Sequence, residues 1–199
     1  GEIIKNGLTS YKLPAPVVPK DIYKVRVPAE RPSWGKADAL VTLIVFNDYE
    51  CIFSGKHFAT LESLKKNFGA KIRIVYVNLP LPFHSKAKNA AYAVLAADMQ
   101  GKFAEMHDFL FKNQAEWSKE NDLFAYLDKK GEELDLDMAK FKKERESQEV
   151  KDIVEKDIAF AASIGVKGTP GTFLNGRFVG GAYPEESFEK VIAEEIERA

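Results

Sequence analysis

The chain has a single cysteine, Cys51, among its 199 residues. One thiol excludes an internal disulfide framework, and it also excludes a cysteine-rich zinc site. The three histidines are scattered without metal-ligand spacing, so the sequence predicts no metal site. Any chemistry of Cys51 has to be explained by one sulfur.

Long apolar runs and an excess of one charge are also missing. No stretch approaches the ~20 apolar residues needed to cross a bilayer. Lysine and arginine total 29 against 30 aspartates and glutamates, so we expect no general attraction to nucleic acid or to an anionic membrane. The first residues lack the charged start and apolar stretch of a signal peptide, but the sequence starts at Gly1, so the compartment has to be inferred from other features.

Strand and helix patterns follow one another from residue 40 onward. The β-branched run 40–46 predicts a strand buried on both faces, and apolar residues at three- to four-residue spacing predict a helix from Phe53 to Gly69. A second apolar strand follows at 72–77. This order predicts a parallel strand pair with a right-handed crossover.

Helical patterns dominate the next eighty residues, and a hairpin follows them. Asn175-Gly176 separates two short strand patterns, and Pro184 opens a final amphipathic helix. The predicted internal helices are 85–100, 102–113, 119–130, 135–146 and 148–164, with Gly101, Gly131 and Gly165 expected at helix ends.

Cys51 falls where the first strand pattern gives way to the first helix pattern. The unpaired N–H groups and the positive field of a helix N-terminus favour thiolate over thiol, so this position suits a nucleophile. A buried inert thiol is the alternative, because free cysteine is among the most buried residue types. The position alone leaves both interpretations open.

A second signal is Gly168-Thr169-Pro170, directly before a strand pattern. A proline in a tight turn can hold a cis peptide bond, although most loop prolines are trans. Its place in the chain, after the helices and before the hairpin, gives this proline more weight than its residue type does.

Three segments together resemble the DsbA-like branch of the thioredoxin superfamily. They are Phe46-Asn47-Asp48-Tyr49-Glu50-Cys51, then Leu79-Pro80-Leu81-Pro82-Phe83-His84, then Gly165 to Pro170 followed by Phe173-Leu174-Asn175-Gly176. The resemblance covers the chain from about Val41 to its C-terminus.

The resemblance implies an α/β thioredoxin fold with an all-helical insertion. Residues 1–38 are expected to form a proline-rich arm with one strand at 22–27, where apolar and charged residues alternate. Residues 39–80 would form the first thioredoxin half, 81–165 the helical insertion and 166–199 the second half.

The same resemblance implies an extracytoplasmic enzyme, usually of the bacterial periplasm, that exchanges disulfides with reduced or misbridged proteins. Cys51 would be the attacking sulfur, while Thr169, Pro170, Ile52 and Phe53 would contact the substrate. A membrane redox partner would fit, whereas nucleic acid and metal would not. No cofactor is expected beyond glutathione as an external thiol.

Two residues depart from the family's usual Cys-Pro-x-Cys motif. Ser54 occupies the position of the resolving cysteine, and Ile52 stands where proline is common. A second thiolate normally breaks the mixed disulfide, and a hydroxyl cannot do this. Ser54 is therefore expected at most to hydrogen-bond Cys51, as a natural monothiol variant or as a cysteine-to-serine replacement that traps the intermediate.

Two other functions compete with disulfide exchange. One is a glutathione-dependent monothiol enzyme, and the other is a redox-inactive peptide-binding or chaperone module. Among the remaining polar residues, we expect Glu50 to face solvent, His57 to be a partly exposed structural residue, His84 to make a loop hydrogen bond and His107 to pack in a helix.

Overall fold

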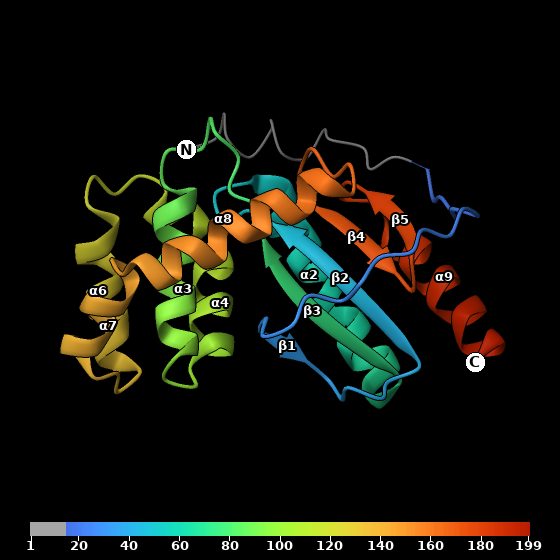
Figure 1. The fold of residues 1–199 in the computed structure, drawn as a ribbon, viewed down its shortest axis with the longest axis horizontal. Helices are drawn as coiled ribbons and strands as arrows, with labels where there is room; N and C mark the ends of the chain where they lie inside the picture. Colours follow the sequence, from blue (N-terminus) through green and yellow to red (C-terminus); the bar gives the residue numbers. More distant parts are fainter. Residues whose placement is uncertain (1–14) are drawn as a thin grey trace, which may run out of the picture.

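A five-stranded mixed sheet forms the centre of the molecule (Figure 1). The computed structural model describes residues 15–199, so the start of the predicted arm lies outside the described residues. Strand β2 pairs in parallel with β3 and antiparallel with β4, and the order across the sheet is β1-β3-β2-β4-β5. The strands are β1 (Ser33–Trp34), β2 (Val41–Asn47), β3 (Ile72–Asn78), β4 (Gly171–Leu174) and β5 (Arg177–Gly180).

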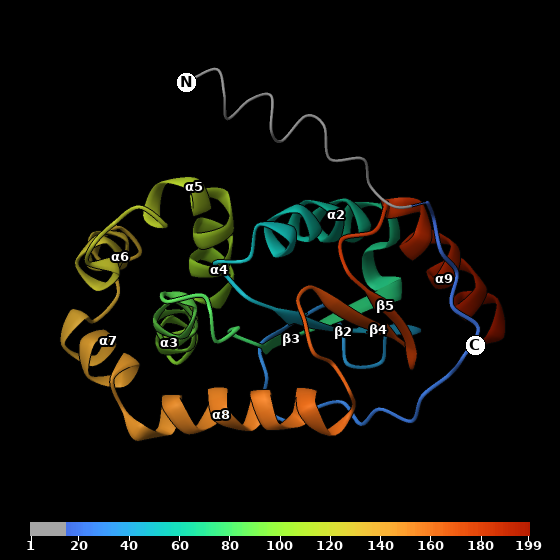
Figure 2. The ribbon, with the colours of Figure 1, turned by 90° about the horizontal axis from the view of Figure 1, so that it is seen from above.

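Helices cover both faces of this sheet, which explains why β2 is apolar on both sides. Helices α2 (Ile52–Phe68) and α9 (Glu185–Arg198) lie on one face, and α8 (Gln148–Ser163) lies on the other (Figure 2). Leu43 and Val45 pack toward α2 and α9, whereas Ile44 and Phe46 pack toward α8. The short 3-10 helix η1 (Gly69–Lys71) leads from α2 into β3.

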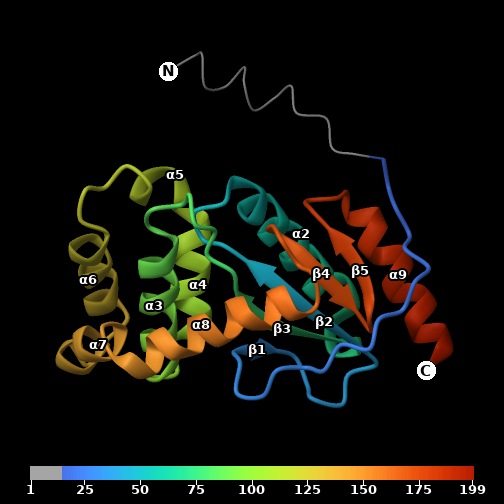
Figure 3. The ribbon, with the colours of Figure 1, turned by 45° about the horizontal axis from the view of Figure 1, so that its top comes forward.

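Five further helices, which all fall within the range 81–165 expected for the insertion, lie beside the sheet (Figure 3), whereas α8 from the same range covers a sheet face. They enclose a core of their own, which includes Met106, Leu110 and Trp117. The side chains of Asp122 and Asp137 cap two of these helices by accepting from backbone amides. The helices are α3 (Ala87–Asp98), α4 (Phe103–Lys112), α5 (Gln114–Trp117), α6 (Leu123–Glu133) and α7 (Met138–Arg145).

One predicted helix end is wrong. Gly101 and Gly165 follow α3 and α8 with φ of +73° and +77°, the left-handed backbone that glycine tolerates. Gly131 instead lies inside α6. A Cβ at this position would come within 2.9 Å of Met138 Sδ, so the glycine allows α6 and α7 to pack closely rather than ending a helix.

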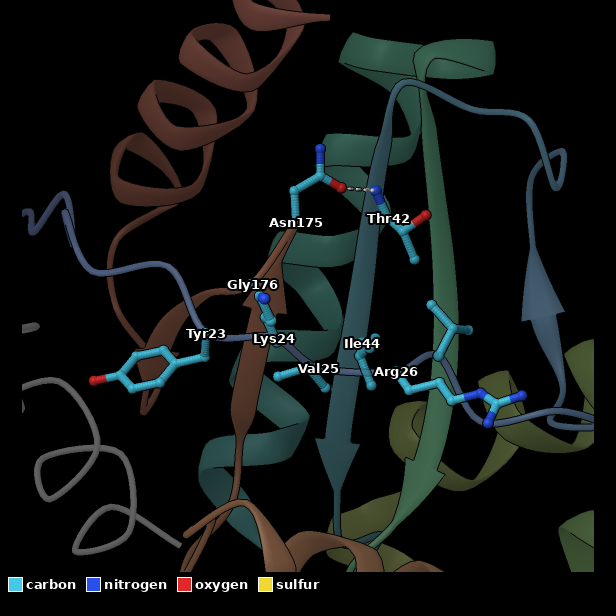
Figure 4. A pocket seen from close by; sticks show the side chains of 9 residues that line it. Tyr23, Lys24, Val25, Arg26, Thr42, Ile44, Asn175 and Gly176 are labelled. Atoms are coloured by element: carbon cyan, nitrogen blue, oxygen red, sulfur yellow. Dashed lines mark hydrogen bonds between the residues drawn. The ribbon is translucent and has the colours of Figure 1, made fainter.

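The strand predicted at 22–27 is also wrong. This segment crosses the sheet instead of running along an edge strand, so it cannot form a ladder (Figure 4). Tyr23 N donates to Gly176 O at 2.8 Å, and Val25 and Val27 pack on the sheet face beside α8. The alternation therefore reflects one-sided packing of an extended arm.

No helix within residues 15–199 combines the length and apolar character needed to cross a membrane.

Candidate active site

Cys51 lies between the end of β2 and the first turn of α2. It occupies the N-cap position of α2, with φ of −72° and ψ of 118°, and its carbonyl accepts from Gly55 N at 3.1 Å. Its own amide donates to Asp48 O at 3.1 Å. Cys51 is 5% exposed, so it is buried at the helix N-terminus, where the helix field stabilises negative charge.

The loop before β4 returns to Cys51 from far along the chain. Cys51 Sγ lies 3.5 Å from Thr169 O, and the peptide bond between Thr169 and Pro170 is cis. This contact brings together two segments that the sequence separates by 118 residues. The carbonyl of Thr169 is thus within reach of anything bonded to the sulfur.

A pocket of about 470 Å³ opens over Cys51. Its rim is apolar where Ile52 and Phe83 line it, because these side chains expose 53% and 76% of their surface. Of the predicted substrate-contacting residues, Thr169, Ile52 and Phe53 line it, whereas Pro170 lines the neighbouring pocket. The lining residues are Glu50, Cys51, Ile52, Phe53, Leu81, Phe83, His84, Lys167, Gly168 and Thr169.

Ser54 does not line this pocket. The residue is 2% exposed, and its Oγ accepts from Asp48 N at 3.3 Å. The expected partner was Cys51, but the hydroxyl faces the amide at the end of β2. Ser54 therefore supports the turn that carries Cys51.

The buried carboxylate of Asp48 fastens this turn to the connector after β3. Its Oδ1 accepts from Glu50 N at 2.8 Å, and its Oδ2 accepts from Leu81 N at 2.8 Å. His84 Nδ1 lies 2.7 Å from the same Oδ2. Because the Asp48 side chain is fully buried, these contacts fix the turn before α2 and the connector after β3 relative to each other.

The prediction that Glu50 faces solvent is wrong. Its Oε2 accepts from Lys86 N at 2.7 Å, at the start of α3, and the residue is half-buried. An acidic group at a helix N-terminus is favourable, because it meets unpaired amides and the positive end of the helix dipole. Glu50 therefore links the active-site turn to the insertion.

Gln114, from α5, makes the second link to the insertion. Its Nε2 donates to Tyr49 O at 2.6 Å and to Cys51 O at 3.0 Å. Gly55 makes room for it, since a Cβ there would come within 2.8 Å of Gln114 Oε1. The backbone around Cys51 is thus held by a side chain from outside the thioredoxin half.

The other two histidines lie in the core. His57 is fully buried rather than partly exposed, its Nε2 lies 2.9 Å from Thr172 Oγ1, and burial lowers its pKa to about 4. His107 packs among aromatic rings, as predicted, and its Nδ1 lies 2.8 Å from Tyr49 Oη. Burial, followed by the charge of Lys65, lowers the pKa of His107 to about 3.

Sequence reasoning missed the polar frame of the site: Asp48, Glu50 and Gln114. Two of these residues directly follow a buried strand, a place where polar side chains often have a role, so that signal was present. Gln114 carries no such signal, because only the folded insertion brings it to Cys51. No group of three or more histidine, cysteine or acidic residues suited to a metal occurs in the part of the chain described.

The strand order, the inserted helices and a cysteine at the head of α2 facing a cis-proline loop define a thioredoxin-fold protein of the DsbA-like kind. The family model described as "Thioredoxin" matches residues 29–194. The chain therefore belongs to the thioredoxin family.

Solved structures share this fold. BdbD from Bacillus subtilis, in its oxidised form, is similar with a TM-score of 0.73 and 23% identity, over 84% of this chain and 93% of that one. The α-DsbA1 protein of Wolbachia pipientis has a TM-score of 0.75 and 17% identity, over 86% of this chain and 93% of that one. At these identities the likeness concerns the fold.

A curated relative carries a different name. The chain is 35% identical over 159 residues to the protein named Na(+)/H(+) antiporter NhaA 1 of Salinispora arenicola. The match covers 79% of this chain and 24% of the relative, so the chain spans about a quarter of the length of the curated relatives it matches. The antiporter name belongs to that whole protein.

Proposed function

We propose that this protein exchanges disulfides with protein substrates through Cys51. The observation that carries the proposal is the position of Cys51 Sγ, at the N-terminus of α2 and 3.5 Å from Thr169 O. A thiolate is the nucleophile in such exchange, and a helix N-terminus stabilises negative charge. The thiol attacks a substrate disulfide and forms a mixed disulfide.

The apolar rim favours protein substrates over small thiols. Ile52 and Phe83 expose large apolar surfaces beside the thiol, and Phe53 lies in the same wall. Reduced or misbridged proteins present apolar segments that folded proteins bury, so such a rim selects them. Thr169 and Pro170 would hold the substrate backbone beside the sulfur.

Ser54 limits the reaction to its first half. Because a hydroxyl cannot attack the mixed disulfide, an external thiol such as glutathione or a second substrate cysteine has to release the product. Under this proposal, the enzyme works in a bacterial extracytoplasmic compartment, as the family resemblance implies. A membrane redox partner is compatible with the same scheme.

Trapping tests the proposal directly. The protein is mixed with a scrambled disulfide protein, quenched with acid and analysed by non-reducing electrophoresis and mass spectrometry. We expect an adduct through Cys51 that accumulates in the wild type and that reducing agent removes. Cys51→Ala is the matched control and should give no adduct.

The pH dependence of alkylation by iodoacetamide separates an activated thiol from an inert one. We expect Cys51 to react at neutral pH, whereas a rate that rises only near about pH 8.5, as for a free cysteine, would contradict the proposal. If the protein prevents aggregation of unfolded substrates equally well after Cys51→Ala, the chaperone alternative holds instead. Saturable turnover of glutathione without any protein substrate would favour the monothiol enzyme.

A further inference from the structure

His84 lies in the pocket of Cys51 and is not yet part of the chemistry. It lines the same cavity, and its side chain is 22% exposed there. His57 and His107, by contrast, are buried in the core. Thiol exchange moves protons on and off sulfur, and histidine is the side chain suited to that task near neutral pH.

Asp48 determines which nitrogen of His84 carries the proton. An ionised carboxylate only accepts hydrogen bonds, so the His84 Nδ1–H donates to Asp48 Oδ2, at 2.7 Å. In the neutral ring, Nε2 then keeps its lone pair and can take up a proton. The same contact orients the ring and stabilises its charged form once Nε2 is protonated.

Charges of both signs surround the ring. Asp48 and Glu50 come from the turn before α2, and Lys167, from the loop before β4, lines the same pocket. Lys86, two residues further along, directs its Nζ to Ser118 O. Acidic and basic side chains therefore lie together at the pocket that holds the ring.

We propose that His84 is the proton-transfer residue of this site: its Nε2 accepts the proton of an attacking thiol and returns it to a departing thiolate. This inference rests on the proposed function of Cys51. It goes beyond that function because it assigns the proton of each exchange to a particular atom, held in place by Asp48.

Both half-reactions balance with this assignment. In the first, the Cys51 proton passes to Nε2, the thiolate attacks a disulfide R1–S–S–R2, and the S–S bond breaks. The departing R2 thiolate takes the proton and leaves as R2–SH, so the Cys51 sulfur is oxidised and the R2 sulfur is reduced. In the second, an external thiol gives its proton to Nε2 and attacks the R1 sulfur, and the departing Cys51 thiolate is protonated again.

The variant His84→Asn isolates the proton-transfer step. The asparagine Nδ2 lies close to the place of the histidine Nδ1 and retains a donor to Asp48, while the group at Nε2 is lost. Mixed-disulfide formation at Cys51 is followed by stopped flow over a range of pH. Two reagents are compared: glutathione disulfide, whose alkyl thiolate needs a proton to leave, and a nitrobenzoate aryl disulfide, whose thiolate does not.

We expect His84→Asn to slow the reaction with glutathione disulfide by about tenfold or more near neutral pH, and the aryl reaction by less than about twofold. The rate with glutathione disulfide should also depend less on pH in the variant, because one proton carrier has been removed. Lys167→Gln is the matched control, because it changes the charge of the same pocket without removing a proton carrier. It should alter both reactions to the same extent.

Three outcomes would count against His84. Equal slowing with both reagents would indicate a positioning role, and equal rates in wild type and variant would indicate no role. A changed unfolding midpoint together with slower alkylation of Cys51 would indicate a damaged site. If the wild type itself forms no mixed disulfide with either reagent, the proposed function fails before His84 is tested.

Discussion

At the scale of single residues, the site consists of one sulfur and a polar frame around it. Under the proposed function Cys51 provides the reacting atom, whereas Ser54 fills the position of a second sulfur with a hydroxyl that supports the turn. Asp48 binds the turn to His84 and to the connector. Changes at these residues should therefore affect chemistry and geometry separately.

Ser54→Cys should restore the missing half of the reaction. The new thiol would lie on the first turn of α2, where it can attack a mixed disulfide on Cys51 and form an internal disulfide. With glutathione disulfide as the oxidant that regenerates this internal disulfide, we expect multiple turnovers in the oxidation of a reduced protein, whereas the wild type should stop at a mixed disulfide on Cys51. Ser54→Ala is the control, because it also loses the hydrogen bond to Asp48 N but adds no sulfur; turnover equal to that of the cysteine variant would contradict the idea.

At the scale of elements, contacts between the arm, the hairpin and α8 fix the sheet. The turn between β4 and β5 meets the arm, because Tyr23 N donates to Gly176 O. Arg31, at the end of the arm, pairs at 2.5 Å with Asp157 of α8, which also accepts from Asn78 N. These two points of attachment predict where stability is sensitive to substitution.

Gly176→Ala should destabilise the protein by about 2 kcal/mol. Gly176 has φ of +91°, and an added Cβ would come within 2.3 Å of Tyr23 O, so both backbone strain and a clash with the arm oppose the change. Gly101→Ala is the matched control, because φ is +73° but nothing lies within 4 Å. Denaturant unfolding should show the smaller loss, about 1 kcal/mol, for the control.

Arg31→Met should destabilise by about 3 kcal/mol at neutral pH, because it leaves a buried carboxylate without its cation. Burial already raises the pKa of Asp157, with Asn78 and Arg31 opposing the rise. A raised native pKa means that the folded variant takes up the proton before the unfolded chain, so the loss should shrink as the pH falls. An unfolding titration at several pH values measures this.

Lys88→Met provides the comparison for Arg31. Lys88 lies in α3 and pairs at 2.7 Å with Glu155, which belongs to α8 as Asp157 does. Both side chains of this pair are about half exposed. Such a surface pair contributes less than about 1 kcal/mol. Equal losses in the two variants would contradict the importance assigned to burial of Asp157.

At the scale of the whole molecule, α8 joins two packing regions. Its Ala161 packs under the sheet, and its Val150 and Val154 pack against α3 of the insertion. Figure 1 shows α8 running from the insertion to the sheet. We therefore expect the two parts to unfold together, with a stability that depends on groups buried in either part.

Stability should fall as the solution is acidified from about pH 6.5 toward pH 4, because histidine in an unfolded chain titrates near pH 6.5. The native pKa values of His57 and His107 are lowered to about 4 and about 3, so in this window the unfolded chain binds more protons. Each group then contributes a slope of up to about 1.4 kcal/mol per pH unit, and the loss increases with falling pH.

A double variant, His57→Leu with Thr172→Val, tests the contribution of His57. Both partners of the buried contact become apolar, so stability at neutral pH should change little. Below about pH 6.5, the slope of the unfolding free energy against pH should fall by up to about 1.4 kcal/mol per pH unit, which corresponds to one proton. An unchanged slope would show that His57 is not the group responsible.

The sequence predicted the fold class, the βαβ order and the hairpin because each depends on local periodicity or turn chemistry. The resemblance added the thioredoxin family and the pairing of Cys51 with the loop at Thr169. The frame around the sulfur was not predictable in the same way, since Gln114 reaches Cys51 O only after α5 has packed. The strand prediction for the arm is wrong because alternation of apolar and charged residues indicates one buried face. It does not show the backbone hydrogen bonds to a neighbouring strand that define a strand.

Gln114 limits how far this protein could be shortened without losing hydrogen bonds around Cys51. Its amide donates to the carbonyls of Tyr49 and Cys51, and Glu50 returns the link by accepting from Lys86 N. A miniature built from the sheet, α2 and α9 alone would lose the donors that Gln114 gives to the two carbonyls and that Lys86 gives to the Glu50 carboxylate. The candidate site therefore depends on the inserted helices. A smaller protein that is meant to keep the site has to include them.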